Sequence, residues 1–180
     1  MASHPPAEYG PEFLSWLRAT TERAWREVDE PSLEDCRESG FIGAHWRRGT
    51  RWAGPLGEDP VVEAERRFGA RFPAQCRLLL TTLHTTTPWM RGADHRSGEL
   101  ALHDSPGFYD WLDDEDPIRA ALDRVADTAE LAEELDAASG LNRRRSGGPS
   151  PQLLPVYGHR YVVGDESEWV LSIVGSDVIG

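Results

Sequence analysis

The stretch that decides the fold lies near the middle of the chain. It reads Glu65-Arg66-Arg67-Phe68-Gly69-Ala70-Arg71-Phe72-Pro73-Ala74-Gln75-Cys76-Arg77-Leu78-Leu79-Leu80. Phe68 ends a helix, because the next residue, Gly69, adopts the left-handed cap conformation without steric cost. Pro73 opens a second helix, where its missing N–H is not needed. We therefore predict two consecutive helices, the first starting at Asp59-Pro60 and the second reaching about His84.

The last third of the chain predicts strands. Residues with β-branched and aromatic side chains dominate Leu153–Val163 and Trp169–Val174, and such residues favour extended structure. An acidic turn at Asp165-Glu166 separates the two segments. Glu99–His103 is a further candidate strand. Helices in the first half and strands later in the chain predict an α+β protein.

Further helices are expected on both sides of the central pair. Apolar residues recur at three-to-four spacing from Pro11 to Asp29, which is the helical period. Ser32 gives a capping-type start to a short helix that ends near Gly40. Asp116-Pro117 caps another helix.

The remaining segments are less regular. Residues 40–58 are rich in Gly, Arg and Trp and predict a loop or a brief extended segment. One more helix is plausible up to Gly140, and residues 141–152, rich in Arg, Gly, Ser and Pro, predict a mobile loop.

Taken in order, these motifs resemble the SUKH superfamily. The resemblance is carried by Trp52-Ala53-Gly54, by Glu-x-x-Phe-Gly-x-x-Phe-Pro at residues 65–73 with the Leu-rich helix after it, by Pro-Val-Tyr-Gly-His-Arg-Tyr at 155–161 and by Val-Leu-Ser-Ile at 170–173. It covers roughly Trp46 to the C-terminus, with a diverged middle. This superfamily includes the yeast cell-wall-assembly regulator and many bacterial immunity proteins of polymorphic toxin systems. The resemblance implies an α+β fold with a cleft between sheet and helices, and binding of partner proteins without catalysis.

The expected organisation is one SUKH-like α+β domain with an extension. Residues 1–40 are predicted to form an N-terminal helical extension packed on the main domain. Residues 41–180 are predicted to form that domain, a small and mostly antiparallel sheet flanked by several helices. A chain of 180 residues is long enough to bury a substantial core.

The net charge of −12 is unevenly distributed. Residues 104–136 hold twelve acids against two arginines, whereas residues 37–91 hold nine arginines against five acids. Two interpretations stay open for the acidic region: a solvated helix face, or a surface that meets a basic partner. Nucleic-acid binding is disfavoured in both, because phosphate contacts need a basic patch.

The sequence also bears on the compartment. No apolar run approaches the ~20 residues that span a bilayer, and the N-terminus lacks a basic stretch followed by an apolar core. We expect a cytoplasmic protein without membrane contact. Cys36 and Cys76 are expected to be reduced thiols rather than a disulfide.

No catalytic signature emerges from the sequence. His84, His103 and His159 lie on separate predicted elements without metal-ligand spacing. Ser172 lacks the Gly-x-Ser-x-Gly turn, and Cys76 lies within a predicted helix beside a Leu-rich stretch, where the sequence places no activating histidine. We predict no metal, no cofactor and no enzymatic activity.

Aromatic residues beside the acidic region suggest a partner surface instead. Trp, Tyr and Arg dominate interface energetics, and Phe108-Tyr109-Asp110-Trp111 directly precedes the acidic run. The candidate partner-binding residues are Trp52, Tyr109, Asp110, Trp111, Asp113, Asp114, Asp116, His159 and Arg160.

The predicted function is that of an immunity protein, which neutralises a cognate bacterial toxin by direct binding. A basic nuclease is one candidate toxin. Two alternatives remain: a regulatory or scaffolding domain in cell-envelope or signalling processes, and, from a different class, an unrecognised hydrolase that uses one of the three histidines. The partner and the oligomeric state are left open.

Overall fold

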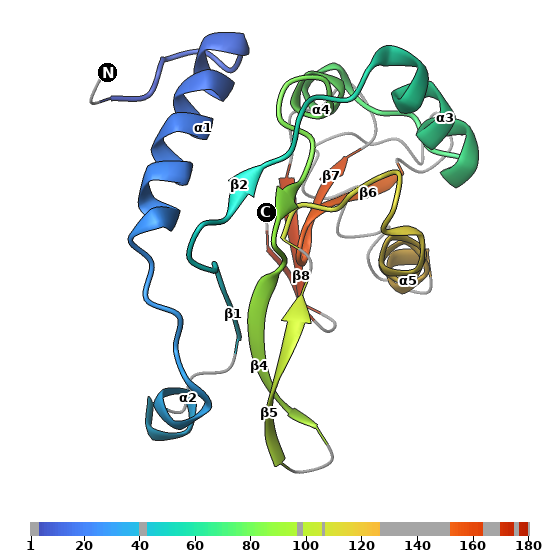
Figure 1. Cartoon of the computed structure of the whole chain (residues 1–180). Coiled ribbons are helices and arrows are strands. Elements are labelled where there is room, and N and C mark those ends of the chain that lie inside the picture. Colours follow the sequence, from blue (N-terminus) through green and yellow to red (C-terminus); the bar gives the residue numbers. More distant parts are fainter. Residues whose placement is uncertain are drawn as a thin grey trace. The chain divides into compact units, whose positions relative to one another are not determined.

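The computed structural model describes residues 4–39, 43–96, 99–105, 107–126, 152–163, 170–174 and 177–179. Five helices and several small antiparallel sheets are found there, so the α+β prediction is confirmed (Figure 1). The chain forms two compact units, Met1–Leu56 with Leu78–Phe108, and Gly57–Arg77 with Tyr109–Gly180. The boundary predicted between residues 40 and 41 lies inside the first unit, and a separate domain 41–180 stays a prediction.

The first unit combines two helices with two small sheets. Its elements are α1 (Pro11–Arg26), α2 (Leu33–Ser39), β1 (Gly43–His45), β2 (Arg51–Trp52), β3 (Thr86–Thr87), β4 (Met90–Arg96) and β5 (Glu99–Ser105). One sheet has the strand order β1-β4-β5 and the other pairs β2 with β3, all antiparallel. The core of this unit gathers Leu14, Trp25, Trp52 and Leu83.

Local sequence explains both helices of this unit. Pro11 occupies the first turn of α1, as predicted, and the helix ends at Arg26. At α2 the Ser32 Oγ accepts the Asp35 N–H at 3.1 Å, and the Asp35 carboxylate accepts the Ser32 N–H at 2.8 Å. This reciprocal capping box confirms the predicted start at Ser32.

The β4–β5 hairpin was predicted only in its second strand. Residues Glu99–His103 lie in β5, but the pattern of Met90–Arg96 did not indicate a strand. The two strands pair residue by residue from Met90 with Ser105 to Arg96 with Glu99. The ring of His103 lies over Gly92, where a Cβ would stand 2.4 Å from the imidazole Nε2. Pairing with β5 therefore imposes extended structure on a segment of weak strand propensity.

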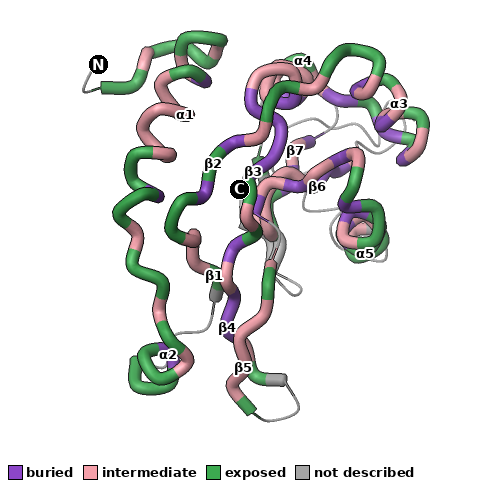
Figure 2. Tube along the Cα trace, viewed as in Figure 1, coloured by how far each residue is buried: buried purple, intermediate pink, exposed green. Residues whose placement is uncertain are grey.

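The second unit contains α3 (Glu58–Phe68), α5 (Glu115–Ala126) and the sheet β6 (Leu153–Tyr157), β7 (Arg160–Val163), β8 (Val170–Val174) and β9 (Asp177–Ile179), paired antiparallel in that order. Helix α4 (Ala74–Leu80) crosses the division between the units. Buried positions recur along α3, α5, β6 and β7 (Figure 2).

The central helix pair is confirmed, but two helix ends differ from the prediction. The first helix was expected to be capped at Asp59-Pro60, but α3 begins at Glu58 with Gly57 as its N-cap and without a side-chain cap. Gly69 follows α3 in the left-handed conformation at φ 60°, and Pro73 directly precedes α4. The second helix was expected to reach His84, but α4 ends at Leu80. The N–H groups of Leu83 and His84 both donate to the Leu79 carbonyl, and His84 itself takes φ 64°, which stops the helix.

The strand predicted at Leu153–Val163 is wrong as one element. It is a hairpin, β6 and β7, that turns at Gly158 with φ 52°. Glycine adopts this conformation at no steric cost, so the chain reverses there. The strand predicted at Trp169–Val174 is confirmed as β8. The helix predicted up to Gly140 lies outside the described residues, as does the loop 141–152 except for Gln152.

Candidate functional site

The acidic turn, defined as residues 110–116, leads into α5 in the second unit. Asp110 Oδ1 accepts the N–H of Leu112 at 2.9 Å and that of Asp113 at 3.2 Å. Asp114 is buried, and its Oδ2 accepts the Asp110 N–H at 2.8 Å. Asp110 and Asp114, both predicted partner-binding residues, therefore use their carboxylates to build the turn.

The outer side of the acidic turn carries exposed carboxylates. Asp113 and Asp116 are exposed, as a partner contact requires, and so is Glu115, which sequence reasoning missed. Glu115 pairs with Arg119 one helical turn later, at 2.8 Å. Because Glu115 and Asp116 lie in the first turn of α5, the helix dipole favours their negative charge.

Trp111 packs the acidic turn against the motif at residues 65–73. It is buried and lies edge-on to Phe68 and Phe72, with ring centroids 5.3 and 4.6 Å away. The Arg67 guanidinium donates to the Leu112 carbonyl at 2.8 Å. Trp111 was predicted to touch a partner, but its side chain lies in the interior of its own unit.

The motif at residues 65–73 owes its shape to Glu65. The Glu65 Oε1 accepts the Phe72 N–H at 2.8 Å and pairs with Arg77 Nη1 at 2.8 Å. Arg77 also binds Glu58 at the start of α3. These contacts hold the loop through Gly69 and thereby place Phe72 against the tryptophan of the acidic turn. The motif spacing was visible in the sequence, whereas its contact with Trp111 was not.

Tyr109 links the acidic turn to the β6–β7 hairpin. Its N–H donates to the Val156 carbonyl at 3.2 Å, and its hydroxyl donates to the Gly158 carbonyl at 2.9 Å. Burial, helped by the neighbouring Tyr161, raises the pKa of Tyr109 to about 12, so the hydroxyl remains a donor at neutral pH. The structure therefore connects the turn with the hairpin tip that holds His159.

The hairpin tip presents two exposed predicted site residues, His159 and Arg160. Arg160 Nη1 lies 2.6 Å from His159 Nε2 and donates to the Ser172 hydroxyl. Desolvation and the Arg160 charge lower the pKa of His159, so its imidazole is neutral at pH 7 and accepts from the guanidinium. The tip therefore carries one positive charge next to a neutral ring.

Trp52 belongs to the first unit and is buried there. Its indole Nε1 donates to Thr21 Oγ1 at 2.9 Å, and its backbone N–H donates to the Glu22 carboxylate at 3.1 Å. Its ring lies 4.5 Å from that of Phe108 and 5.9 Å from that of Trp25. Trp52 was predicted to touch a partner, but its side chain packs in an aromatic core within the first unit.

Among the described residues, no three His, Cys, Asp or Glu side chains gather where a metal ion could bind. Burial, with the nearby Glu65 charge, raises the pKa of the Cys76 thiol to about 12, which removes the thiolate that a nucleophile needs. In the same part of the chain, no helix is long and apolar enough to span a bilayer.

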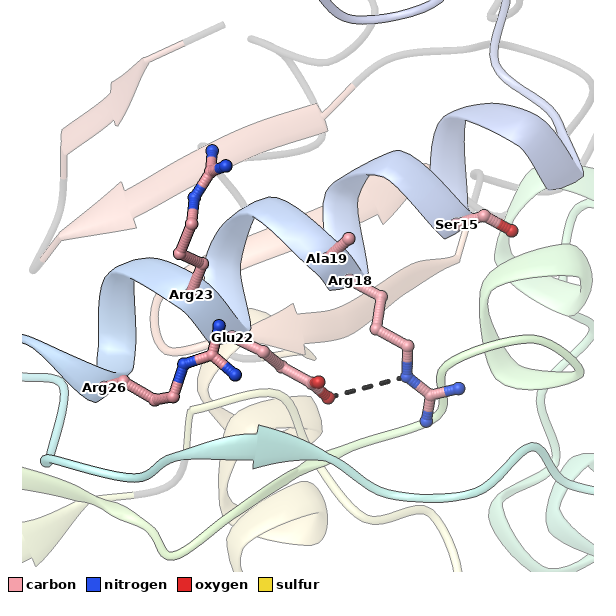
Figure 3. Close-up of a pocket in the computed structure, with 6 residues that line it drawn as sticks. All are labelled: Ser15, Arg18, Ala19, Glu22, Arg23 and Arg26. Carbon is pink, nitrogen blue, oxygen red and sulfur yellow. Dashed lines mark ion pairs between the residues drawn. The ribbon is translucent and has the colours of Figure 1, made fainter. Parts of the chain in front are cut away.

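A pocket of about 310 Å³ runs along one face of α1 (Figure 3). Its lining residues are Ser15, Arg18, Ala19, Glu22, Arg23 and Arg26. Arg18 pairs with Glu22 at 3.5 Å and donates to the Ala53 carbonyl, so both side chains hold α1 to the β2 region. The lining offers no nucleophile next to a base, and this pocket is not a catalytic candidate.

Comparisons with protein-family models, with curated proteins and with solved structures gave no match to this chain. The candidate site therefore rests on its own geometry: exposed acids on a turn that buried aromatic residues hold in place.

Proposed function

We propose that this chain is a non-enzymatic, SUKH-like protein-binding domain that neutralises a cognate bacterial toxin by direct binding in the cytoplasm. The observation that supports the proposal is the acidic turn, where Asp113, Glu115 and Asp116 are exposed while Trp111 is buried beneath them. A surface of this kind fits a positively charged protein partner.

The contacts that hold the acidic turn in place favour binding. The Asp110 and Asp114 carboxylates accept hydrogen bonds that fix its backbone, and Trp111 and Tyr109 anchor it to the motif and to the hairpin. A surface that is already ordered loses little conformational entropy when a partner docks. The carboxylates are thus presented in one arrangement before the partner arrives.

The charge of this region favours fast and selective association. The exposed acids of the turn and α5 are Asp113, Glu115, Asp116 and Asp123, against the exposed Arg119 and Arg124. Charge complementarity mainly raises the association rate and rejects wrong partners. Arg160 at the hairpin tip adds a cation that a matching acidic group on the partner would meet.

The test requires a toxin domain encoded beside the gene for this chain, and the absence of such a gene there would favour a regulatory or scaffolding domain instead. Bacteria expressing that domain should grow only when this chain is co-expressed, and the two purified proteins should bind by calorimetry. Changing Asp113 and Asp116 together to Ser should weaken binding about tenfold, equivalent to about 1.4 kcal/mol. Absence of growth rescue and of binding would contradict the proposed function.

A further inference from the structure

The outer edge of β5 is a second candidate interaction surface, independent of the acidic turn. The sheet β1-β4-β5 has two edges, of which β1 has three residues and β5 has seven. Helix α2 contacts β5, and no strand in the described ranges pairs with its outer side. Such an edge offers a row of backbone N–H and C=O groups to another strand.

The other sheet edges of the described chain are short or blocked. β6 contains Pro155, which has no N–H, and its Val156 carbonyl accepts the Tyr109 N–H. β9 has three residues, and β2 and β3 have two each. β5 has no proline, and it pairs with β4 without a register shift. An edge of this length that is neither interrupted by proline nor bulged offers a regular row of backbone groups for pairing.

We propose that β5 pairs antiparallel with β5 of a second copy of this chain. A two-fold axis perpendicular to the sheet keeps like faces together, so residues of one face lie opposite residues of the same face. Centring the pairing on Ala101 places Leu100 opposite Leu102 of the second copy. Centring it on Leu102 would instead place Leu100 opposite Asp104, an apolar group against a carboxylate.

The Ala101 register is also complementary in polarity. It sets Glu99 opposite His103 of the second copy, a carboxylate facing an imidazole. Leu100 and Leu102 are half-buried in the single chain and would cover each other in the dimer. The β4–β5 hairpins of two copies would then form one continuous sheet.

The experiment measures mass by sedimentation over a concentration series. Wild-type protein should approach twice the chain mass of 20.1 kDa as concentration rises. Ala101→Lys should remain monomeric, because two lysines would face each other across the axis. The fold should tolerate this lysine, because Asp94 of β4 lies directly opposite residue 101 in the same chain. Ala44→Lys, an exposed position on the opposite sheet edge, is the matched control and should dimerise normally.

Mixing variants tests the register. Ala101→Glu should also be monomeric alone, and an equal mixture with Ala101→Lys should recover the dimer mass. If Ala101→Glu does not fold, the comparison of Ala101→Lys with Ala44→Lys decides. A wild type that stays monomeric throughout, with rapid amide exchange in β5 until a different protein is added, would overturn the proposal. So would an Ala101→Lys variant that dimerises like Ala44→Lys.

Discussion

Trp52 and Trp111 are both buried tryptophans that were predicted to bind a partner, yet they lie in different surroundings. Trp52 packs in the aromatic core of the first unit, where side chains of α1 accept hydrogen bonds from its backbone N–H and its indole N–H. Trp111 packs between Phe68 and Phe72, on a turn whose outer residues are exposed acids. The difference shows that one buried tryptophan serves a core alone, while the other also fixes a surface.

The largest expected effect separates these two roles. Trp52→Ala and Trp111→Ala should each lower the free energy of unfolding by about 3–5 kcal/mol, because each leaves a large cavity. Only Trp111→Ala should also speed amide exchange across residues 110–116, measured by hydrogen–deuterium exchange in the native state. Equal exchange of that turn in both variants would show that Trp111 does not hold it.

A smaller effect tests how the motif supports Trp111. Glu65→Ala should cost about 1–3 kcal/mol in urea unfolding, because the Phe72 N–H loses its acceptor and Arg77 loses a partner. Glu63→Ala removes an exposed ion pair with Arg66 on the same helix and should leave stability unchanged. A loss of similar size in both variants would mean that the contacts of Glu65 stabilise the fold no more than an exposed ion pair does.

The cap between the motif helices gives a still smaller effect. Gly69 stands at φ 60° with no heavy atom near the position of an added Cβ, so Gly69→Ala tests backbone strain alone. It should cost about 1 kcal/mol. Gly54→Ala, equally open but without a positive φ, is the control in the first unit. Thermal unfolding of both variants measures the difference, and a stable Gly69→Ala would argue against the observed cap.

The buried thiol of Cys76 tests the interior of the second unit through its labelling rate. In a Cys36→Ala background, Cys76 should resist a thiol reagent at pH 8, because its pKa is raised to about 12. Folding stability should fall only above the ordinary thiol pKa of 9.0, where the unfolded chain ionises and the folded one does not. Rapid labelling of native protein at pH 8 would show that the second unit is open there.

Local signals in the sequence predicted the helices well. Ser32 with Asp35, and Gly69 with Pro73, act within a few residues, so they mark helix ends without knowledge of the fold. Strand β4 was missed because its extended form depends on pairing with β5. The hairpin at Gly158 was missed because the apolar residues on both sides read as one strand.

The candidate site was predicted only as a neighbourhood. The sequence placed aromatic residues beside acids in 109–116, but it gave no sign of which of them face solvent. That outcome depends on contacts from distant segments: Phe72 covers Trp111, and the Gly158 carbonyl accepts from Tyr109. Asp110 and Asp114 look equivalent to Asp113 and Asp116 in the sequence, yet their carboxylates bond within the turn.

We propose that the exposed acids of this turn meet a basic protein. The most direct measurement is the rate of association with a toxin domain encoded by a neighbouring gene as salt is raised, for wild type and for the Asp113→Ser, Asp116→Ser double variant. The double variant should associate more slowly and depend less on salt. Glu34→Ser with Glu38→Ser, exposed acids of α2, changes net charge equally and should behave more like wild type. Identical rates and salt dependence for the two double variants would contradict the account.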